Sequence, residues 1–123
     1  MSIADDVVRD FGLTMGMPGL AFNQNGVVRL KFERNGALSI ERTAHGALLQ
    51  LARPADRLRD GALERALGLC HFEAVDRLRP DAGLARDGSL VFSVRLDERA
   101  LDVPALEQAF NFLCRLHDRA AGV

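Results

Sequence analysis

Residues 27–40 read VVRLKFERNGALSI, and this stretch decides the fold. Apolar and charged side chains alternate from Val28 to Glu33, which is the period-two pattern of a strand that buries one face. The alternation resumes at Leu38, directly after an Asn-Gly pair. Asn-Gly is the strongest short hairpin signal, because both central positions of a type I′ turn need a positive φ. The stretch therefore predicts two antiparallel strands joined by a tight turn.

Two further strand signals extend this hairpin into a larger sheet. The sequence ALLQLA at 47–52 predicts a third strand, joined to the second by a turn at His45-Gly46. The sequence GLARDGSLVFSVRL at 83–96 predicts a second hairpin that turns at Asp87-Gly88. We therefore expect a meander of three strands followed, later in the chain, by two more antiparallel strands.

Helical periodicity fills the segments before, between and after these strands. Apolar residues recur at helical spacing over 3–15, 60–76 and 102–120. The resulting order is α-β-β-β-α-β-β-α. This order predicts an α+β fold with an antiparallel sheet and helices packed on one face. The length fits a single domain over residues 1–123.

The composition is that of a soluble globular protein. Hydrophobic residues make up 48% and charged residues 27% of the chain, so a packed core is possible and disorder is not expected. The net charge of −1 argues against bulk attraction to nucleic acid or to an anionic membrane. No apolar run approaches the roughly 18 residues of a membrane helix. The first ten residues do not resemble a signal peptide, so we expect a cytoplasmic protein without stable membrane insertion.

No group of residues predicts covalent or metal chemistry. The three histidines lack a partner four residues away that would chelate a metal on a helix. Cys70 and Cys114 lie in apolar surroundings, which favours free buried thiols over a disulfide. No phosphate-binding loop is present in the sequence. We expect no catalytic residue, no metal and no cofactor.

Two stretches at opposite ends of the chain resemble a known family. The sequence FGLTMGMPGLAFNQNGVVRLKF at 11–32 is similar to the opening of class I type III secretion chaperones, which share the CesT/Tir-chaperone-like fold. These chaperones begin with a short helix, a Gly-x-Pro turn flanked by apolar residues, and a strand. The sequence GSLVFSVRLDERALDVPALEQAFNFLCRLHDRAAGV at 88–123 resembles their final strand and helix, and is most similar to the SycN type.

The resemblance implies a function as well as a dimeric fold. It implies a bacterial virulence chaperone that binds the N-terminal segment of a secreted YopN-like gatekeeper in extended form, without ATP. It also implies that the chain pairs with a second small chaperone of the YscB type. Peripheral contact with the inner-membrane secretion apparatus is compatible with this role. A homodimeric class I chaperone for a single effector is the nearest alternative.

Two surfaces are expected to carry this function. Met side chains are flexible and adapt to varied partners, so a client groove is expected between the first helix and the first strands. The middle helix is apolar over more of its girth than one sheet can cover, which predicts a dimer interface. The alternative for both surfaces is ordinary core. The expected client-binding residues are Met15, Met17, Leu20 and Phe22, and the expected interface residues are Leu63, Leu67, Leu69, Cys70, Phe72 and Val91.

Two classes of function outside the chaperones would leave other patterns in the sequence. A small-molecule binding or enzymatic α+β domain would need convergent polar groups in a pocket, and the sequence offers no obvious set. A nucleic-acid module that uses its sheet surface would need exposed aromatic residues on its strands. Phe32 and Phe92 instead lie on the apolar faces of their predicted strands.

Overall fold

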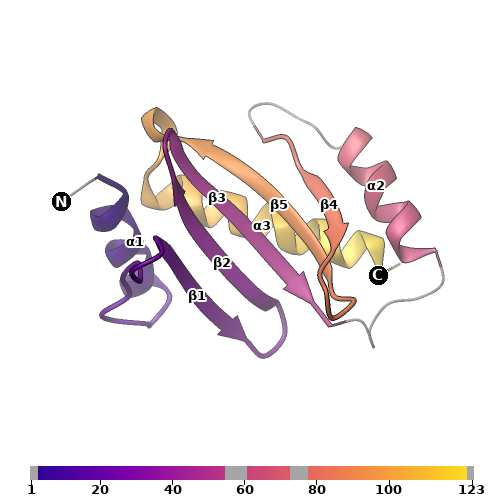
Figure 1. Ribbon diagram of the computed structural model, residues 1–123, viewed down its shortest axis with the longest axis horizontal. Coiled ribbons are helices and arrows are strands. Elements are labelled where there is room, and N and C mark those ends of the chain that lie inside the picture. Colours follow the sequence, from indigo (N-terminus) through magenta and orange to yellow (C-terminus); the bar gives the residue numbers. More distant parts are fainter. Residues whose placement is uncertain (1–2, 55–60, 73–77, 122–123) are drawn as a thin grey trace.

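A computed structural model describes residues 3–54, 61–72 and 78–121 of the chain (Figure 1). The predicted order of helices and strands is confirmed, with one short 3-10 helix added before the last helix. The elements are α1 (Ile3–Thr14), β1 (Val27–Phe32), β2 (Gly36–Thr43), β3 (Gly46–Arg53), α2 (Ala62–Phe72), β4 (Asp81–Leu84), β5 (Leu90–Asp97), η2 (Glu98–Ala100) and α3 (Val103–Ala120).

The five strands form one antiparallel sheet in the order β1-β2-β3-β5-β4. The first three strands are the predicted meander, and β5 pairs with β3 so that the second hairpin continues the same sheet. This order leaves β1 and β4 as the two edge strands. Figure 1 shows α1 beside the β1 end of the sheet and α2 beside the β4 end.

The first hairpin differs from the prediction at its turn. Gly36 pairs with Phe32 as a strand residue, so the loop contains the three residues 33–35 and is not a two-residue Asn-Gly turn. Gly36 has a φ of 109°, and a Cβ atom added there would collide with the backbone carbonyl oxygen of Ala52 on β3. The glycine is therefore required by the close approach of the third strand as well as by its backbone conformation.

The second connection differs in the same way. Thr43 pairs with Gly46, so the turn residues are Ala44 and His45, and Gly46 begins β3. A Cβ atom on Gly46 would collide with the carbonyl oxygen of Leu96 on β5. The glycine was correctly placed near the turn, but its role is to let two strands and the start of η2 come together.

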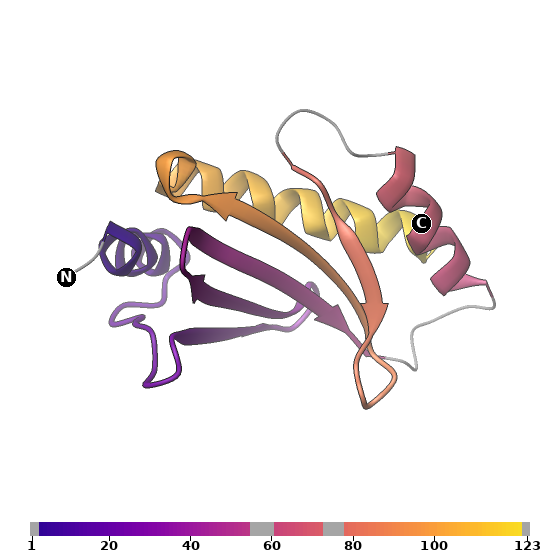
Figure 2. The same ribbon diagram turned by 45° about the horizontal axis from the view of Figure 1, so that its top comes forward.

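All three helices lie on one face of the sheet, as predicted, and the core lies between them and the strands (Figure 2). α3 packs across β3 and β5, while α1 contacts α3 and α2 contacts both α3 and β4. Asp102 caps α3 by accepting a hydrogen bond from the backbone N–H of Ala105 at 2.7 Å. Of the apolar stripe predicted for this helix, Leu106, Phe110, Leu113 and His117 are buried as expected, and Val103 in the first turn is half-buried.

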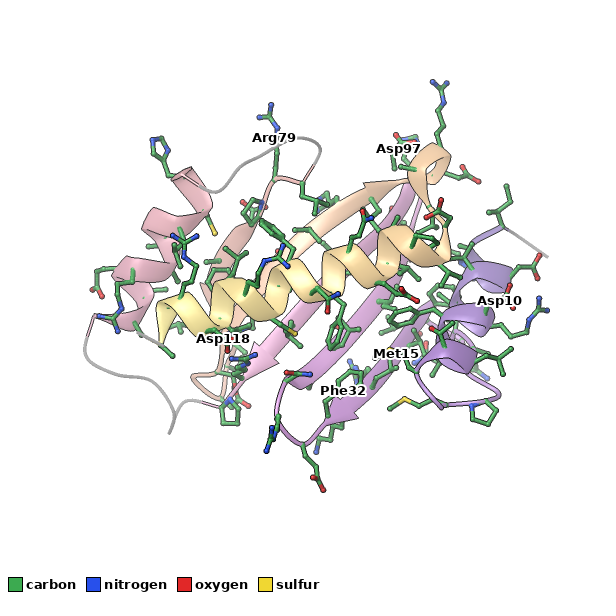
Figure 3. The ribbon with its side chains drawn as sticks, turned by 180° about the vertical axis from the view of Figure 1, so that it is seen from behind. Asp10, Met15, Phe32, Arg79, Asp97 and Asp118 are labelled. Carbon is green, nitrogen blue, oxygen red and sulfur yellow. The ribbon has the colours of Figure 1, made fainter. Side chains whose placement is uncertain are left out.

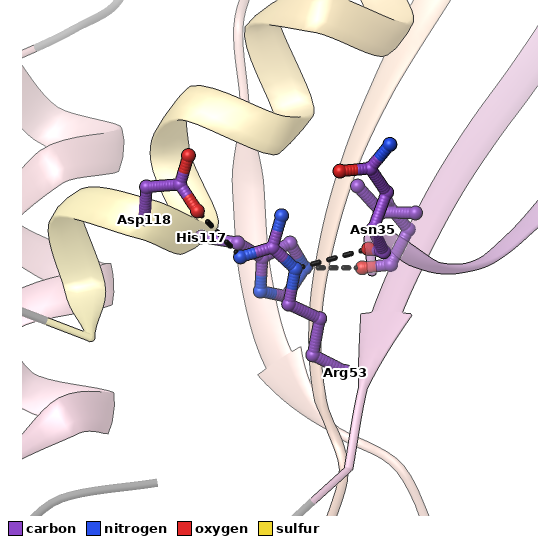
Figure 4. A network of polar contacts seen from close by, with 5 residues as sticks. Asn35, Arg53, His117 and Asp118 are labelled. Carbon is purple, nitrogen blue, oxygen red and sulfur yellow. Dashed lines mark hydrogen bonds and ion pairs between the residues drawn. The ribbon is translucent and has the colours of Figure 1, made fainter. Parts of the chain in front are cut away.

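A polar network fastens the C-terminal part of α3 to the sheet (Figure 4). The Nε atom of Arg53 donates to the carbonyl of Asn35 at 2.9 Å, and its Nη1 atom lies 2.7 Å from Asp118. The Nε2 atom of the buried His117 lies 2.6 Å from the carbonyl oxygen of Leu51, the geometry of a ring N–H donating to that oxygen. Because these contacts join α3, β3 and the first hairpin loop, they fix the helix against the centre of the sheet.

Candidate binding surfaces

Large apolar side chains are exposed at two separate places in the described residues. Ile3 and Leu13 on α1 are 58% and 57% exposed, and Leu67 on α2 and Leu84 on β4 are both 52% exposed. A single exposed apolar side chain of this size is common on protein surfaces. Here two of them lie on α1 at one end of the molecule, and two lie on α2 and β4 at the other end. The pairs mark an N-terminal surface around α1 and a second surface at α2 and β4.

The N-terminal surface contains the four residues predicted to bind a client. Met15, Met17, Leu20 and Phe22 are all half-buried and pack against the core. Figure 3 shows Met15 where α1 ends, on the helix side of the sheet. Their side chains are thus divided between core and solvent. This division is compatible with both roles considered for them, so client binding by these residues stays a prediction.

The loop that carries these four residues is folded back against α1. The backbone N–H of Met17 donates to the carbonyl oxygen of Gly12 at 2.7 Å. A Cβ atom on Gly12 would lie 2.7 Å from both the Cβ atom of Leu20 and the carbonyl oxygen of Met17, which is closer than real Cβ contacts. Gly12 therefore allows the chain to reverse direction against the helix it has just left.

Arg42 holds the far end of the same loop against the sheet. Its guanidinium lies 3.0 Å from Asp5 on α1, and its Cζ atom lies 5.1 Å from the centroid of the Phe22 ring. Its backbone N–H donates to the carbonyl oxygen of Gly26 at 2.8 Å. One residue of β2 thus contacts the helix, the loop and the turn before β1. These contacts define the shape of the N-terminal surface.

The second surface is built on α2, whose apolar residues are divided between core and solvent. Ala62 and Ala66 are buried, and Leu67 points into solvent. Of the other predicted interface residues on this helix, Leu63, Leu69 and Cys70 are half-buried against the molecule's own core. The side chain of Phe72 lies outside the described residues. The wide apolar girth of α2 therefore serves the core in part and leaves Leu67 available to another chain.

The structure separates Val91 from the other predicted interface residues. Val91 is half-buried on β5 and pairs with Ala52 on one side and Gly83 on the other. Its neighbours Leu90 and Phe92 point into the core, so Val91 faces the opposite side of the sheet, away from the helices. An interface that included both α2 and Val91 would have to extend around the β4 edge.

The sequence interpretation missed the exposed residues Leu13, Leu84 and Ile3. Leu13 does not share the helical spacing of the other apolar residues over 3–15. An apolar residue on the polar side of a helix could have indicated a contact surface. Leu84 pairs with the buried Leu90, but it lies on β4, which is an edge strand of the sheet formed by the described residues. Ile3 shares the helical spacing of the apolar residues over 3–15, but it is exposed at the first residue of α1.

Titratable groups in the described residues show no arrangement typical of catalysis. Burial, with a smaller contribution from Asp81, raises the pKa of the Cys70 thiol to about 11, and burial also raises the pKa of Cys114. Raised pKa values keep thiols protonated and unreactive near neutral pH. Both cysteines are free, as predicted, but they are half-buried and not fully buried. Within the described ranges, no cluster of three His, Cys, Asp or Glu residues could hold a metal ion, and no helix is long and apolar enough to cross a membrane.

The chain is similar to known secretion chaperones over nearly its whole length. It matches the family described as type III secretory system chaperone SycN over residues 3–121. It is 34% identical over 119 residues to the chaperone protein SycN of Yersinia enterocolitica, and the match covers 94% of each chain.

Two solved complexes contain a chain with the same fold. One is the ExsC–ExsE complex, with a TM-score of 0.76 and 17% identity, covering 98% of this chain and 92% of that chain. The other is the HopA1–SchA chaperone–effector complex, with a TM-score of 0.73 and 18% identity, covering 96% and 92%. At these identities the likeness supports the fold alone.

Proposed function

Because the chain belongs to the SycN family of type III secretion chaperones, we propose that it binds the N-terminal segment of a secreted YopN-like gatekeeper in extended form. Binding keeps that segment soluble and competent for secretion, and needs no ATP. The family consists of secretion chaperones and not of a class of enzymes. We extend this to the chain itself and propose that it catalyses no reaction, uses no cofactor and works in the cytoplasm.

The observation that carries the proposal is that exposed apolar side chains lie near the edge strands β1 and β4 at the two ends of the molecule. On β1 the outward-facing backbone groups of Val27 are already paired with Asn23, so the edge that a client could use begins at Arg29. An extended segment has unpaired backbone groups, and an edge strand offers it hydrogen-bond partners while nearby apolar side chains accept its anchors. The β1 edge lies beside α1, whose Leu13 is exposed and which leads into the half-buried Met15 and Met17. We propose this end as the client site, with Leu20 and Phe22 completing its apolar lining.

The β4 end is then available for the second chaperone. Leu67 and Leu84 lie on two elements that contact each other, so they can contribute to one apolar surface. A partner of the YscB type would cover this surface in a heterodimer, with Leu63, Leu69, Cys70 and Phe72 supporting it and Val91 at its margin. A second copy of this chain would cover the same side chains in a homodimer. The experiment below must therefore distinguish the heterodimer from the homodimer.

Co-expression tests both parts of the proposal. The full chain is produced alone, with a YscB-type chaperone, and with that chaperone plus the N-terminal region of the gatekeeper, in ATP-free buffer. We expect poor solubility of the chain alone and a stable ternary complex when all three are present, measured by light scattering after gel filtration. A soluble homodimer that binds the gatekeeper region without the second chaperone would overturn the heterodimer in favour of the single-effector chaperone.

A further inference from the structure

A hollow lies at the end of the sheet where β2 turns into β3 and where β5 leads into η2. Its volume is about 670 Å³, which is within the range of small-molecule sites in proteins. Half of its lining residues are apolar, and three of these four are alanines, so a ligand would meet short side chains there. We call it the turn hollow, and its lining residues are Thr43, Ala44, His45, Ala47, Arg95, Leu96, Asp97 and Ala100.

Backbone contacts fix the walls of the turn hollow. The backbone N–H of Glu98 donates to the carbonyl oxygen of His45 at 2.8 Å, which ties η2 to the β2–β3 turn. Gly46 lies between Thr43 and Asp97 in the strand register, and a Cβ atom on it would collide with the backbone of β5. The space between Thr43 and Asp97 therefore holds no side chain. The hollow is formed in the folded chain, so a ligand would not have to open it.

Two opposite charges lie close together on the wall formed by β5. Arg95 and Asp97 are two residues apart on this strand, so their side chains project to the same side and their Cα atoms are about 7 Å apart. Both are exposed, and neither forms an ion pair with any residue in the described parts of the chain. Asp97 accepts the backbone N–H of Arg99 through Oδ1 at 2.9 Å, and its second oxygen can accept from another donor. One cation and one carboxylate are thus within reach of a single small molecule.

This arrangement of charges favours a zwitterion over a simple ion. A plain carboxylate would be attracted by Arg95 but repelled by Asp97, and a plain amine would meet the reverse. A molecule with a carboxylate and an ammonium on one carbon satisfies both side chains, and a guanidinium binds a carboxylate through two parallel hydrogen bonds. The short apolar residues of the lining leave room for an apolar substituent on the same carbon. These requirements describe an α-amino acid with an apolar side chain.

From these observations we propose that the turn hollow binds a free α-amino acid with an apolar side chain. The carboxylate of the ligand pairs with Arg95 and its ammonium donates to Asp97. Its side chain lies against the alanines of the lining, while Thr43 and His45 supply further hydrogen-bonding groups. A ligand that binds only the folded chain stabilises it by mass action, so the stability of this protein would rise with the concentration of the amino acid.

The turn hollow is separate from both surfaces assigned to the chaperone function. None of its lining residues belongs to the N-terminal surface around α1 or to the surface at α2 and β4. Figure 1 shows the β2–β3 turn beside the end of β5, at the end of these strands that lies away from α2. The amino acid can therefore bind while the client and the second chaperone occupy their own surfaces, and this inference goes beyond the proposed function without depending on it.

A series of leucine analogues tests the charge pattern in the unmodified protein. The full chain is purified with the YscB-type chaperone, or alone if that complex does not form, and L-leucine is titrated while backbone amide shifts are followed by NMR. We expect L-leucine to shift the amides of residues 43–47 and 95–100 with a dissociation constant of about 1 mM or lower. The analogue 4-methylpentanoate lacks the ammonium and leucinamide lacks the carboxylate, so each should bind at least about tenfold more weakly.

Two variants test the role of each charge. Arg95→Gln removes the cation, and Asp97→Asn removes the carboxylate while keeping a side-chain oxygen for the N–H of Arg99. Each should weaken L-leucine binding at least about tenfold. Arg29→Gln is the matched control, because Arg29 is also an exposed strand residue and lies outside the turn hollow. It should change the affinity less than about twofold.

Three results would overturn the inference. The absence of saturable shifts at the turn hollow would show that it binds no amino acid. If either analogue binds as tightly as L-leucine, the site recognises a simple ion and not a zwitterion. Full affinity for L-leucine in both Arg95→Gln and Asp97→Asn would place the ligand elsewhere. None of these measurements uses the gatekeeper, so their failure leaves the proposed chaperone function unaffected.

Discussion

The two ends of the molecule expose similar apolar side chains but hold their helices in place differently. At the N-terminal end, Arg42 joins α1, the following loop and the sheet through an ion pair, a ring contact and a backbone hydrogen bond. At the other end, α2 rests on the core through Ala62 and Ala66, and Arg65 donates to the carbonyl of Ala120 at 2.9 Å.

This difference suggests different kinds of partner for the two ends. The N-terminal surface is formed by a loop whose shape is fixed by several separate contacts, which suits a client segment that brings no fold of its own. The other surface is the outer side of a regular helix that packs on the core through Ala62, Ala66 and several half-buried apolar residues, which suits a partner that is already folded. The predictions below test this division, beginning with the change expected to have the largest effect.

Leu67→Asp should dissociate the complex with the second chaperone while the chain stays folded. Leu67 is exposed in the single chain, so the change costs little there, but a carboxylate without a partner in an apolar interface is strongly unfavourable. We expect at least about a hundredfold loss of affinity, measured by light scattering over a dilution series.

Leu13→Asp is the matched variant at the opposite end, because Leu13 is equally exposed on a helix. It should reduce binding of the gatekeeper region and leave the heterodimer intact. If Leu67→Asp leaves the mass of the complex unchanged, or if both variants affect the same partner, the assignment of one partner to each end is wrong.

Met17→Glu combined with Phe22→Glu should weaken client binding at the N-terminal surface. Each uncompensated charge is expected to cost on the order of 1–3 kcal/mol of binding, or roughly ten- to hundredfold in affinity. Because both residues also pack against the core, we expect a lower melting temperature as well. Calorimetry of the variant and pull-down of the gatekeeper region separate the two effects.

Two outcomes of that experiment would change the interpretation of the loop. A variant that unfolds at room temperature would show that Met17 and Phe22 serve the core and that Leu13 alone marks the surface. A folded variant that binds the gatekeeper with full affinity would exclude the loop from the client site. The Leu67→Asp chain is a suitable control, since it should keep the N-terminal surface unchanged.

His117 should make stability depend on pH at the α2 end of α3. Its surroundings, mainly burial, lower its pKa from 6.5 to about 4, with Arg53 also lowering it and the Leu51 carbonyl and Asp118 opposing the shift. Between these pH values the unfolded chain binds more protons than the folded chain, so the free energy of unfolding falls as the pH falls. The contribution of His117 to the free energy of unfolding should be at its maximum above about pH 6.5. Near pH 4 the free energy of unfolding should be lower by on the order of 1–3 kcal/mol.

Urea unfolding across this pH range measures the effect, and His117→Gln is its control. The glutamine amide still has a donor for the carbonyl of Leu51 but does not titrate. The variant should be less stable at pH 7, because the T-shaped contact with Phe92 is lost, and should vary less between pH 6.5 and pH 4. An equally steep profile in the variant would assign the pH dependence to other groups.

Replacing both thiols should have the smallest effect. Cys70→Ser with Cys114→Ser puts hydroxyl groups at two half-buried sites, and we expect a loss of stability of about 1 kcal/mol per site and full binding of both partners. Differential scanning calorimetry and the co-expression assay measure the two quantities. A folded double variant that no longer binds would reveal a function of a thiol at the α2 end.

Periodicity predicted those parts of the fold that depend on local pattern. The strand alternation around Leu30 and Leu38 and the stripe on α3 were sufficient, because a buried face leaves a regular pattern in the sequence. The loop of the first hairpin was predicted wrongly because the role of Gly36 depends on the carbonyl of Ala52 in the third strand. A contact between residues so far apart leaves no local signal.

The candidate surfaces were predicted less completely, for a related reason. Apolar residues in α2 indicated a buried helix, but the sequence did not show that Ala66 faces the core while Leu67 faces solvent. Alternation along 90–96 places Val91 on the face opposite Leu90 and Phe92, yet its small neighbours on that face, Ala52 and Gly83, come from other strands. The composition of that face appears only when the register is known, because its residues are dispersed along the chain.

The length of α3 has a consequence for the clients that such a molecule can accept. The helix has 18 residues and is therefore about 27 Å long. It contacts α1 and α2 and packs across the sheet between them, so it sets a fixed spacing that neither end can alter alone. A client chain that runs the length of this helix needs at least about eight extended residues to do so. Under the proposed function, a client bound at the N-terminal surface therefore reaches the second chaperone at the α2 end only if at least this number of residues follows its anchor.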